Sequence, residues 1–150
     1  METGNSSMQL TRGADYAVRV MIHLAGLARH SRNSLSALSR ATAAPESFLS
    51  KVLQALVRAG LVASHRGQSG GFELAPAGRS ASVRQVIEAV DGPLHLNLCL
   101  YPSRTCSRKS WCPAHPVWER AQRAMLQELD AALIEDLAAC ASPAAIGQTP

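Results

Sequence analysis

The chain has 150 residues, 47% of them hydrophobic, and a formal net charge of +4 at pH 7. These values predict one globular domain with a substantial core, and they exclude an intrinsically disordered chain. No apolar run reaches the ~18 residues of a membrane-spanning helix, and the first seven residues lack the basic and apolar parts of a secretory signal. We therefore expect a cytoplasmic protein that makes no contact with membranes.

The basic residues are concentrated in the first half of the chain. Residues 1–80 contain nine Lys or Arg and four Asp or Glu, whereas residues 81–150 contain six and seven. A basic half joined to a near-neutral half indicates contact with a polyanion such as nucleic acid. A solvated basic surface would give the same counts, so the charge needs support from the pattern of elements.

Apolar residues recur at helical spacing through the first sixty positions. Ser34 can cap a helix through its hydroxyl, Pro45 suits the first position of the next helix, and Gly60 can end that helix in a left-handed conformation. After a loose tail over residues 1–7, the pattern predicts helices over 15–29, 35–41 and 45–59.

A glycine-rich stretch at 65–71 lies between two short apolar segments, 61–64 and 72–74, and this arrangement predicts a β-hairpin. Helix, turn, helix and basic hairpin in this order are typical of a winged helix-turn-helix, whose second helix enters the major groove of DNA. An αα-hairpin followed by an ordinary surface loop is the alternative. At the hairpin tip, Arg66 can reach phosphate or a narrow minor groove, and Gly67 allows a close backbone approach. The outward positions of the second helix complete the predicted DNA contacts: Ser47, Phe48, Ser50, Lys51 and Gln54.

Three more helices are predicted beyond the hairpin. Ser82 and Gln85 match a capping box for a helix over 83–90, Pro116 introduces a long helix ending near residue 131, and a short helix covers 133–139. Because a winged helix contacts one half-site, we expect the long helix to pair two chains. Its candidate dimerisation residues lie at three- and four-residue steps: Trp118, Ala121, Met125 and Leu129. The predicted organisation is a DNA-binding domain over 8–91, a cysteine loop over 92–116, dimerisation and terminal helices over 117–141 and a flexible tail over 142–150.

Three cysteines and a histidine fall within 17 residues, with the spacing Cys-x6-Cys-x5-Cys-x2-His. The segment is poor in apolar residues and contains two prolines, so it is predicted to be a loop. Thiolates bind zinc, copper(I) or iron–sulfur clusters, and imidazole suits zinc and iron. In a reducing cytosol, clustered thiols indicate metal ligands or redox sensors rather than structural disulfides. The candidate ligands are Cys99, Cys106, Cys112 and His115.

The chain resembles the Rrf2 family of bacterial winged-helix regulators from about residue 8 to residue 139. The resemblance lies in Leu10-Thr11-Arg12, Asp15-Tyr16-Ala17-Val18-Arg19, Arg66-Gly67-x-x-Gly70-Gly71, Val86-Ile87-x-x-Val90 and the cysteine loop. It implies a homodimeric DNA-binding repressor controlled by an iron–sulfur cluster that senses redox state, nitric oxide or iron supply.

The resemblance also implies roles for single residues. Cys99, Cys106 and Cys112 would be cluster ligands, His115 matches the fourth ligand of IscR-like members, and Asp15 matches an aspartate that reaches the cluster from the partner subunit in NsrR-like members. The first cysteine spacing is six residues here, one more than the family pattern. His115 favours a 2Fe–2S cluster, since imidazole replaces thiolate at some such irons, whereas Asp15 keeps a 4Fe–4S cluster open.

Some of these residues also fit purely structural roles. Asp15 also suits a helix start, and His115 also suits a capping or packing role beside Trp118. Trp111 would either shield a cluster or fill the interior of the loop, and Cys140 is expected to be a small, half-buried residue.

Two other interpretations of the cysteine loop remain open. One is a regulator with a structural Cys3His zinc site, and the other is a regulator with no metal that uses a Cys106–Cys112 disulfide. An enzyme is not expected, because the sequence has no glycine-rich phosphate loop and the winged-helix interpretation leaves no evident substrate pocket.

Overall fold

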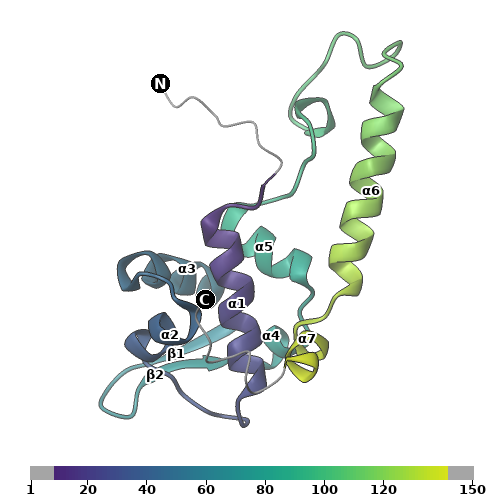
Figure 1. Cartoon of the computed structure of the whole chain (residues 1–150). Helices are drawn as coiled ribbons and strands as arrows, with labels where there is room; N and C mark the ends of the chain where they lie inside the picture. The colour runs from purple at the N-terminus through teal and green to yellow at the C-terminus, as the bar shows by residue number, and fades with distance from the viewer. Residues whose placement is uncertain (1–8, 142–150) are drawn as a thin grey trace.

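The computed structural model describes residues 9–141 and shows a mainly helical protein with one two-stranded antiparallel hairpin. This confirms the predicted fold class. Figure 1 shows α1 passing through the middle of the molecule, with α2, α3 and the hairpin on one side and α5 and α7 on the other. The elements are α1 Arg12–Gly26, α2 Leu35–Thr42, α3 Glu46–Arg58, β1 Val62–His65, β2 Gly71–Leu74, α4 Pro76–Arg79, α5 Val83–Asp91, the 3-10 turn η1 Leu98–Leu100, α6 His115–Ala131 and α7 Ile134–Cys140.

The hydrophobic core surrounds α1. Helices α2, α3, α5 and α7 all pack against it, and its own buried face includes Ala17, Met21 and Leu24. On α3, the helical spacing of apolar residues predicts a buried stripe of Leu49, Val52, Leu53, Leu56 and Val57, and this is confirmed except for the half-buried Val57. The predicted helix over 15–29 would place Ala28 on the core-facing side of α1, but Ala28 is exposed, because α1 ends at Gly26. The buried residues of α3 are Leu49, Val52, Leu53 and Leu56.

Helix boundaries follow the capping side chains. The prediction placed the start of α1 at residue 15, but the hydroxyl of Thr11 accepts from the Ala14 N–H at 3.1 Å, so α1 begins at Arg12. The predicted cap at Ser34 and the capping box at Ser82 are both present. Pro45 lies one position before α3 rather than inside it.

Two short elements were not predicted. Helix α4 has only four residues, and η1 lies within the segment expected to be irregular. The cysteine loop ends at residue 114 rather than 116, because α6 begins at His115. From here the name cysteine loop denotes residues 92–114.

Helix α6 projects away from the rest of the protein and carries the cysteine loop at its far end (Figure 1). Of its 17 residues only His115 is buried. We call α6 the arm, and the remaining elements other than η1 the body. Across residues 9–141, no helix combines the length and apolarity needed to cross a bilayer.

The chain returns from the arm to the body through a two-bond bridge. The Val83 N–H donates to the Ala132 carbonyl at 2.9 Å, and the Ile134 N–H donates to the Ala81 carbonyl at 2.9 Å. Ile134 is fully buried in the core, so α7 belongs to the body although it follows the arm in sequence.

Candidate functional site

Helix α3 presents one face to solvent next to the core-facing stripe. Ser47, Phe48, Lys51 and Gln54 are exposed, whereas Ser50 is half-buried. The ring of Phe48 packs edge-on against Tyr16 of α1, with 5.6 Å between ring centroids. The exposed face therefore offers hydroxyl and amide groups, one cation and an aromatic ring held in place by α1.

The hairpin pairs Val62 with Leu74 and His65 with Gly71, and it leaves residues 66–70 as an exposed tip. Arg66 and Gly67 lie in this tip. The tip is closed by a hydrogen bond from the Gly70 N–H to the Gly67 carbonyl at 3.0 Å. Gly67 has a φ of +96°, which is costly for residues with a side chain, so glycine at this position suits the turn.

The segment before α2 holds the hairpin against the body. Asn33 exchanges two backbone hydrogen bonds with Phe72, at 3.0 and 2.8 Å, and acts as a short third strand. A Cβ atom on Gly71 would lie 2.7 Å from the Asn33 carbonyl oxygen, so the close approach requires glycine. Arg32 adds a hydrogen bond from its Nη1 to the Ser69 carbonyl at 3.2 Å.

A carboxylate at the base of the hairpin gathers three basic side chains, and the sequence analysis did not identify it. Glu73 lies 2.9 Å from His30 Nδ1, 2.9 Å from His65 Nε2 and 3.7 Å from Arg32 Nε. The pKa of Glu73 is lowered, chiefly by the hydrogen bond with His30 and further by the charge of His65. We name these four residues the Glu73 cluster.

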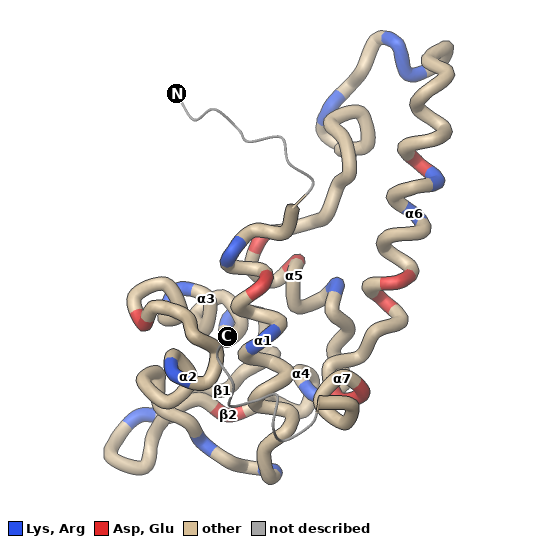
Figure 2. The backbone as a smooth tube through the Cα atoms, viewed as in Figure 1, with Lys and Arg blue, Asp and Glu red and all other residues tan. Residues whose placement is uncertain are grey.

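Figure 2 shows Lys and Arg positions on most parts of the chain. Several lie on α2, α3 and the hairpin at one end of the body, others lie on α1, α5 and the arm, and a further set lies on the cysteine loop at the far end of the arm. The positions on α2, α3 and the hairpin belong to the elements that the sequence predicts to contact a polyanion.

The cysteine loop is built from local turns. From residue 98 to residue 115 its backbone hydrogen bonds join residues three or four apart, such as Cys112 N–H to the Arg108 carbonyl at 2.7 Å. Trp111 is 67% exposed, so it does not fill the interior of the loop. Turns of this kind fix few long-range distances, which leaves the loop free to reorganise around a ligand.

The first and last candidate ligands meet where the loop joins the arm. His115 Nδ1 lies 3.4 Å from the Cys99 sulfur, and His115 is only 7% exposed. The other ring nitrogen, Nε2, is buried and forms no hydrogen bond, although Glu119 Oε1 lies 3.2 Å away. Nδ1 is therefore the ring nitrogen that faces the candidate thiolate, and Nε2 faces the Glu119 carboxylate.

The remaining candidate ligands are not gathered with this pair. Cys106 lines a cavity of about 380 Å³ together with Cys99. Cys112 is half-buried in the loop. Within residues 9–141, no three His, Cys, Asp or Glu side chains are grouped closely enough to hold a metal ion. The donor types fit an iron–sulfur cluster or zinc, but the four side chains are not preassembled around either.

Asp15 and Cys140 both lie outside the cysteine loop. Asp15 forms an ion pair with Arg19 at 2.9 Å on α1, and Figure 1 shows that the part of the loop at the far end of the arm lies away from α1. Cys140 is exposed at the end of α7, so the expectation of a half-buried residue was wrong.

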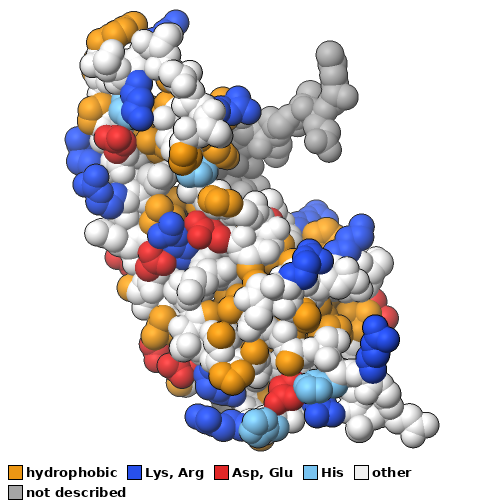
Figure 3. Space-filling view, turned by 180° about the vertical axis from the view of Figure 1, so that it is seen from behind, with side chains coloured by type: hydrophobic (Ala, Val, Ile, Leu, Met, Phe, Trp, Pro, Cys, Tyr) orange, Lys and Arg blue, Asp and Glu red, His pale blue; other side chains and the backbone are white. Residues whose placement is uncertain are grey.

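The arm exposes apolar side chains. Trp118 is 38% exposed and Val117 is 46% exposed. Ala121 is exposed as well, whereas Met125 and Leu129 are half-buried, and Leu129 packs against the core. Figure 3 shows hydrophobic side chains along the arm and at its far end, interspersed with Lys and Arg.

Comparisons with known proteins agree on one family. A family model described as Rrf2, an iron-dependent transcriptional regulator, matches residues 10–140. An HTH-type transcriptional regulator of Rhodobacter capsulatus, described as rrf2-like, is 30% identical over 144 residues, which cover 91% of this chain and 96% of that protein.

Solved structures share the fold along most of its length. T. potens IscR has a TM-score of 0.72 and 24% identity, with 95% of each chain covered. The oxidized form of Staphylococcus aureus CymR has a TM-score of 0.68 and 26% identity, with 87% of this chain and 96% of CymR covered.

Proposed function

This chain belongs to the Rrf2 family of transcriptional regulators, and from that premise we propose that it is a homodimeric repressor whose DNA affinity is controlled by an iron–sulfur cluster. The family consists of DNA-binding regulators rather than enzymes, so the chain binds DNA and is not an enzyme. We place its action in the cytoplasm, where thiols stay reduced.

The contact between Cys99 and His115 carries this proposal. It brings together the two ends of a 17-residue segment that also contains Cys106 and Cys112. With the ends held, the two remaining thiols lie on local turns that can rearrange at little cost. Three thiolates and one imidazole then form a complete donor set within one chain.

We assign the fourth ligand to His115 and therefore favour a 2Fe–2S cluster. Its imidazole Nδ1 already lies 3.4 Å from the Cys99 sulfur, whereas Asp15 pairs with Arg19 on α1. A role for Asp15 in a 4Fe–4S cluster requires the partner subunit's loop to reach α1, and it stays a prediction.

A cluster at this position would supply sensitivity to oxidants, nitric oxide and iron shortage. The contribution of the protein is the ordering of its own loop, because the free energy of binding a metal centre is also free energy of folding for the segment that binds it. The loop joins the arm at His115, so its ordering acts directly on the start of α6.

For DNA, we propose that α3 enters the major groove and that the hairpin tip lies against the backbone or the minor groove. The hydrogen bonds between Asn33 and Phe72 support this, since they fix the hairpin relative to the body that carries α3. The proposed contact residues are Ser47, Phe48, Ser50, Lys51, Gln54, Arg66 and Gly67.

We propose that two chains pair through the arm. A 17-residue helix with a single buried residue leaves apolar side chains in water, and a second copy would cover them. Trp118 and Ala121 are the most exposed of the four predicted dimerisation residues, and Met125 and Leu129 continue the same stripe towards the body.

A metal-free thiol switch is the second candidate. Two observations favour it: no metal-binding group is preassembled within residues 9–141, and one related structure, CymR, is described in an oxidized form. In this alternative Cys106 and Cys112 form a disulfide. A structural zinc site would use the same donors as the cluster and would be colourless.

Anaerobic purification followed by absorption spectroscopy and an assay for iron and sulfide tests the proposal. The wild type should be coloured and contain both elements, Cys106→Ala should lose both, and Cys140→Ala is the matched control because Cys140 lies outside the loop. Zinc in place of iron would identify the structural site. Protein without any metal, but with a Cys106–Cys112 disulfide after oxidation, would establish the thiol switch instead.

A further inference from the structure

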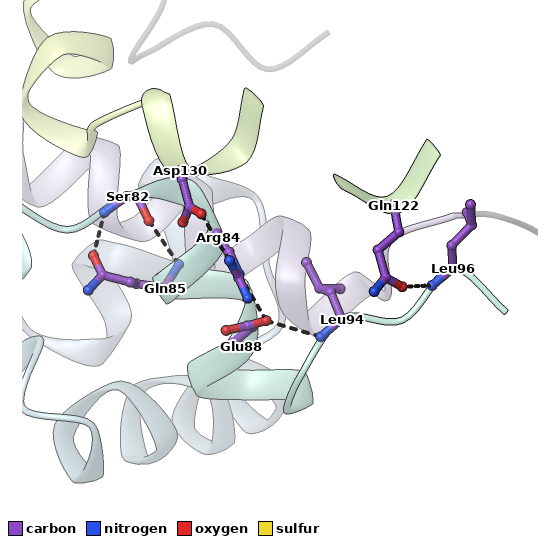
Figure 4. Close-up of polar contacts among 8 residues, drawn as sticks. All are labelled: Ser82, Arg84, Gln85, Glu88, Leu94, Leu96, Gln122 and Asp130. Atoms are coloured by element: carbon purple, nitrogen blue, oxygen red, sulfur yellow. Dashed lines mark hydrogen bonds and ion pairs between the residues drawn. The ribbon is translucent and has the colours of Figure 1, made fainter. Parts of the chain in front are cut away.

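Two side chains hold the first residues of the cysteine loop (Figure 4). The carboxylate of Glu88, on α5, accepts the backbone N–H of Leu94 at 3.1 Å. The side-chain carbonyl of Gln122, on the arm, accepts the backbone N–H of Leu96 at 2.9 Å. The segment that leads to Cys99 is thus fastened to the body by one bond and to the arm by the other.

Arg84 connects the Glu88 anchor to the arm. Its Nε donates to the same Glu88 oxygen that accepts Leu94, at 3.2 Å, and its Nη1 donates to Asp130 on the arm at 2.9 Å. These bonds raise the pKa of Arg84, the one to Asp130 most strongly. A guanidinium can serve both partners at once, because its nitrogens point along fixed and different directions.

The same guanidinium borders the candidate ligand site. Arg84, Cys99 and His115 line one cavity of about 430 Å³ between the loop and the arm. On its other side, α5 packs against both α1 and α3. Arg84 therefore lies on a helix that contacts the DNA-facing helix, and its side chain reaches the place where the loop closes.

We infer that Arg84 and Glu88 are positioning residues that transmit the state of the cysteine loop to α5 and, through α5, to α3. This inference rests on the proposed function. Reorganising the loop would move Leu94, which shares its acceptor atom with Arg84, and Arg84 joins α5 to the arm beside the backbone bridge between Val83 and Ala132. These links are hydrogen bonds with defined directions, so they respond to geometry rather than to charge alone, and the last step, from α5 to α3, is helix packing.

The first test needs no cluster. In the apo protein, Glu88→Ala should accelerate hydrogen exchange of the Leu94 amide and leave that of Leu96 unchanged, while Gln122→Ala should do the opposite. The two variants control for each other, since general destabilisation would accelerate both amides in both proteins. Acceleration of both amides by either variant alone would overturn the assignment of the two anchors.

The second test measures coupling. The dissociation constant for an operator duplex is determined for apo protein and for protein reconstituted anaerobically with ferrous iron and sulfide. Couplings of this kind usually change affinity about 5- to 150-fold. Arg84→Gln should reduce the wild-type ratio by at least about threefold. Arg84→Lys should do nearly the same, because one ammonium cannot reproduce both directed bonds.

Glu128→Gln, on the same end of the arm, is the matched control and should retain the wild-type ratio. A wild-type ratio near one would overturn the proposed function, and the inference with it. A clear wild-type ratio that Arg84→Gln leaves unchanged would overturn the inference alone. A wild-type ratio in Arg84→Lys would also overturn the inference, because a positive charge without the two directed bonds would then be enough for the coupling.

Discussion

The body and the cysteine loop of this protein are organised by different means. In the body, side chains from five helices and a hairpin meet in one buried cluster, and long-range backbone bonds such as Asn33 to Phe72 join its parts. In the loop, backbone-to-backbone hydrogen bonds remain local and the three candidate cysteines are half-buried, while His115 at the start of the arm is buried. Burial of apolar surface is the dominant favourable term in folding, so most of the free energy that stabilises the fold comes from the body. Under the proposed function, the cluster would order the loop and a second copy would cover the arm.

Truncating the core should have the largest effect. Leu53→Ala removes a fully buried side chain of α3 and should lower the free energy of unfolding by about 2–5 kcal/mol in urea denaturation. Met125→Ala, on the arm, should cost less than about 1 kcal/mol at a protein concentration too low for pairing. Equal losses from the two variants would show that the arm is part of the core.

Removing an exposed apolar side chain from the arm should affect the pairing of two chains rather than the folding of one. Trp118→Ala should raise the dissociation constant of the dimer about 30-fold in sedimentation equilibrium, as expected for an aromatic side chain at an interface. Circular dichroism of the variant should match the wild type. Glu128→Ala serves as the control, and an unchanged dissociation constant for Trp118→Ala would place the interface elsewhere.

Changing the hairpin tip should affect DNA affinity and leave both pairing and the loop intact. Arg66→Ala should weaken binding and reduce the slope of log affinity against log salt by about 0.9, the value for one phosphate contact. Arg120→Ala removes the same charge from the arm and should leave the slope unchanged. If Arg66→Ala kept the wild-type slope, Arg66 would not contact phosphate.

The smallest effect concerns pH. Since the pKa of Glu73 in the folded protein lies below its ordinary value of 4.5, the ionised carboxylate stabilises the fold above that pH. The stabilisation is lost as the pH falls through the lowered pKa. Glu73→Gln should therefore reduce the free energy of unfolding at pH 7 and differ less from the wild type at pH 3. The exposed Asp136→Asn is the comparison, and a difference that grows on acidification would contradict the assignment.

The sequence alone predicted those elements whose pattern lies in residues close together along the chain. Helical periodicity located α3 and its buried stripe, and the pattern of Ser82 and Gln85 located the start of α5. It placed the start of α1 three residues late, because the cap at Thr11 was not recognised. It missed α4, because four residues are too few for a periodic pattern.

Contacts between distant residues could not be predicted in the same way. Glu73 lies 43 residues from His30, and Asp130 lies 46 residues from Arg84. No spacing rule relates such pairs, since their meeting depends on the packing of whole elements. The cysteine spacing did identify the loop, and the structure adds that its first and last donors already touch, which no spacing rule could have predicted.

The two-bond bridge between residues 81–83 and 132–134 has an evolutionary consequence. The chain between these two points consists of α5, the loop and the arm, and both of its ends are fixed at one point of the body, so a change of length between Leu100 and Cys112 does not alter where the chain leaves and re-enters the core. Such a segment can drift in length while the DNA-contacting part stays constant. The six-residue spacing after Cys99 then needs no compensating change elsewhere in the chain. In the same way, evolution could replace the ligands of the loop while the part that binds the operator is kept.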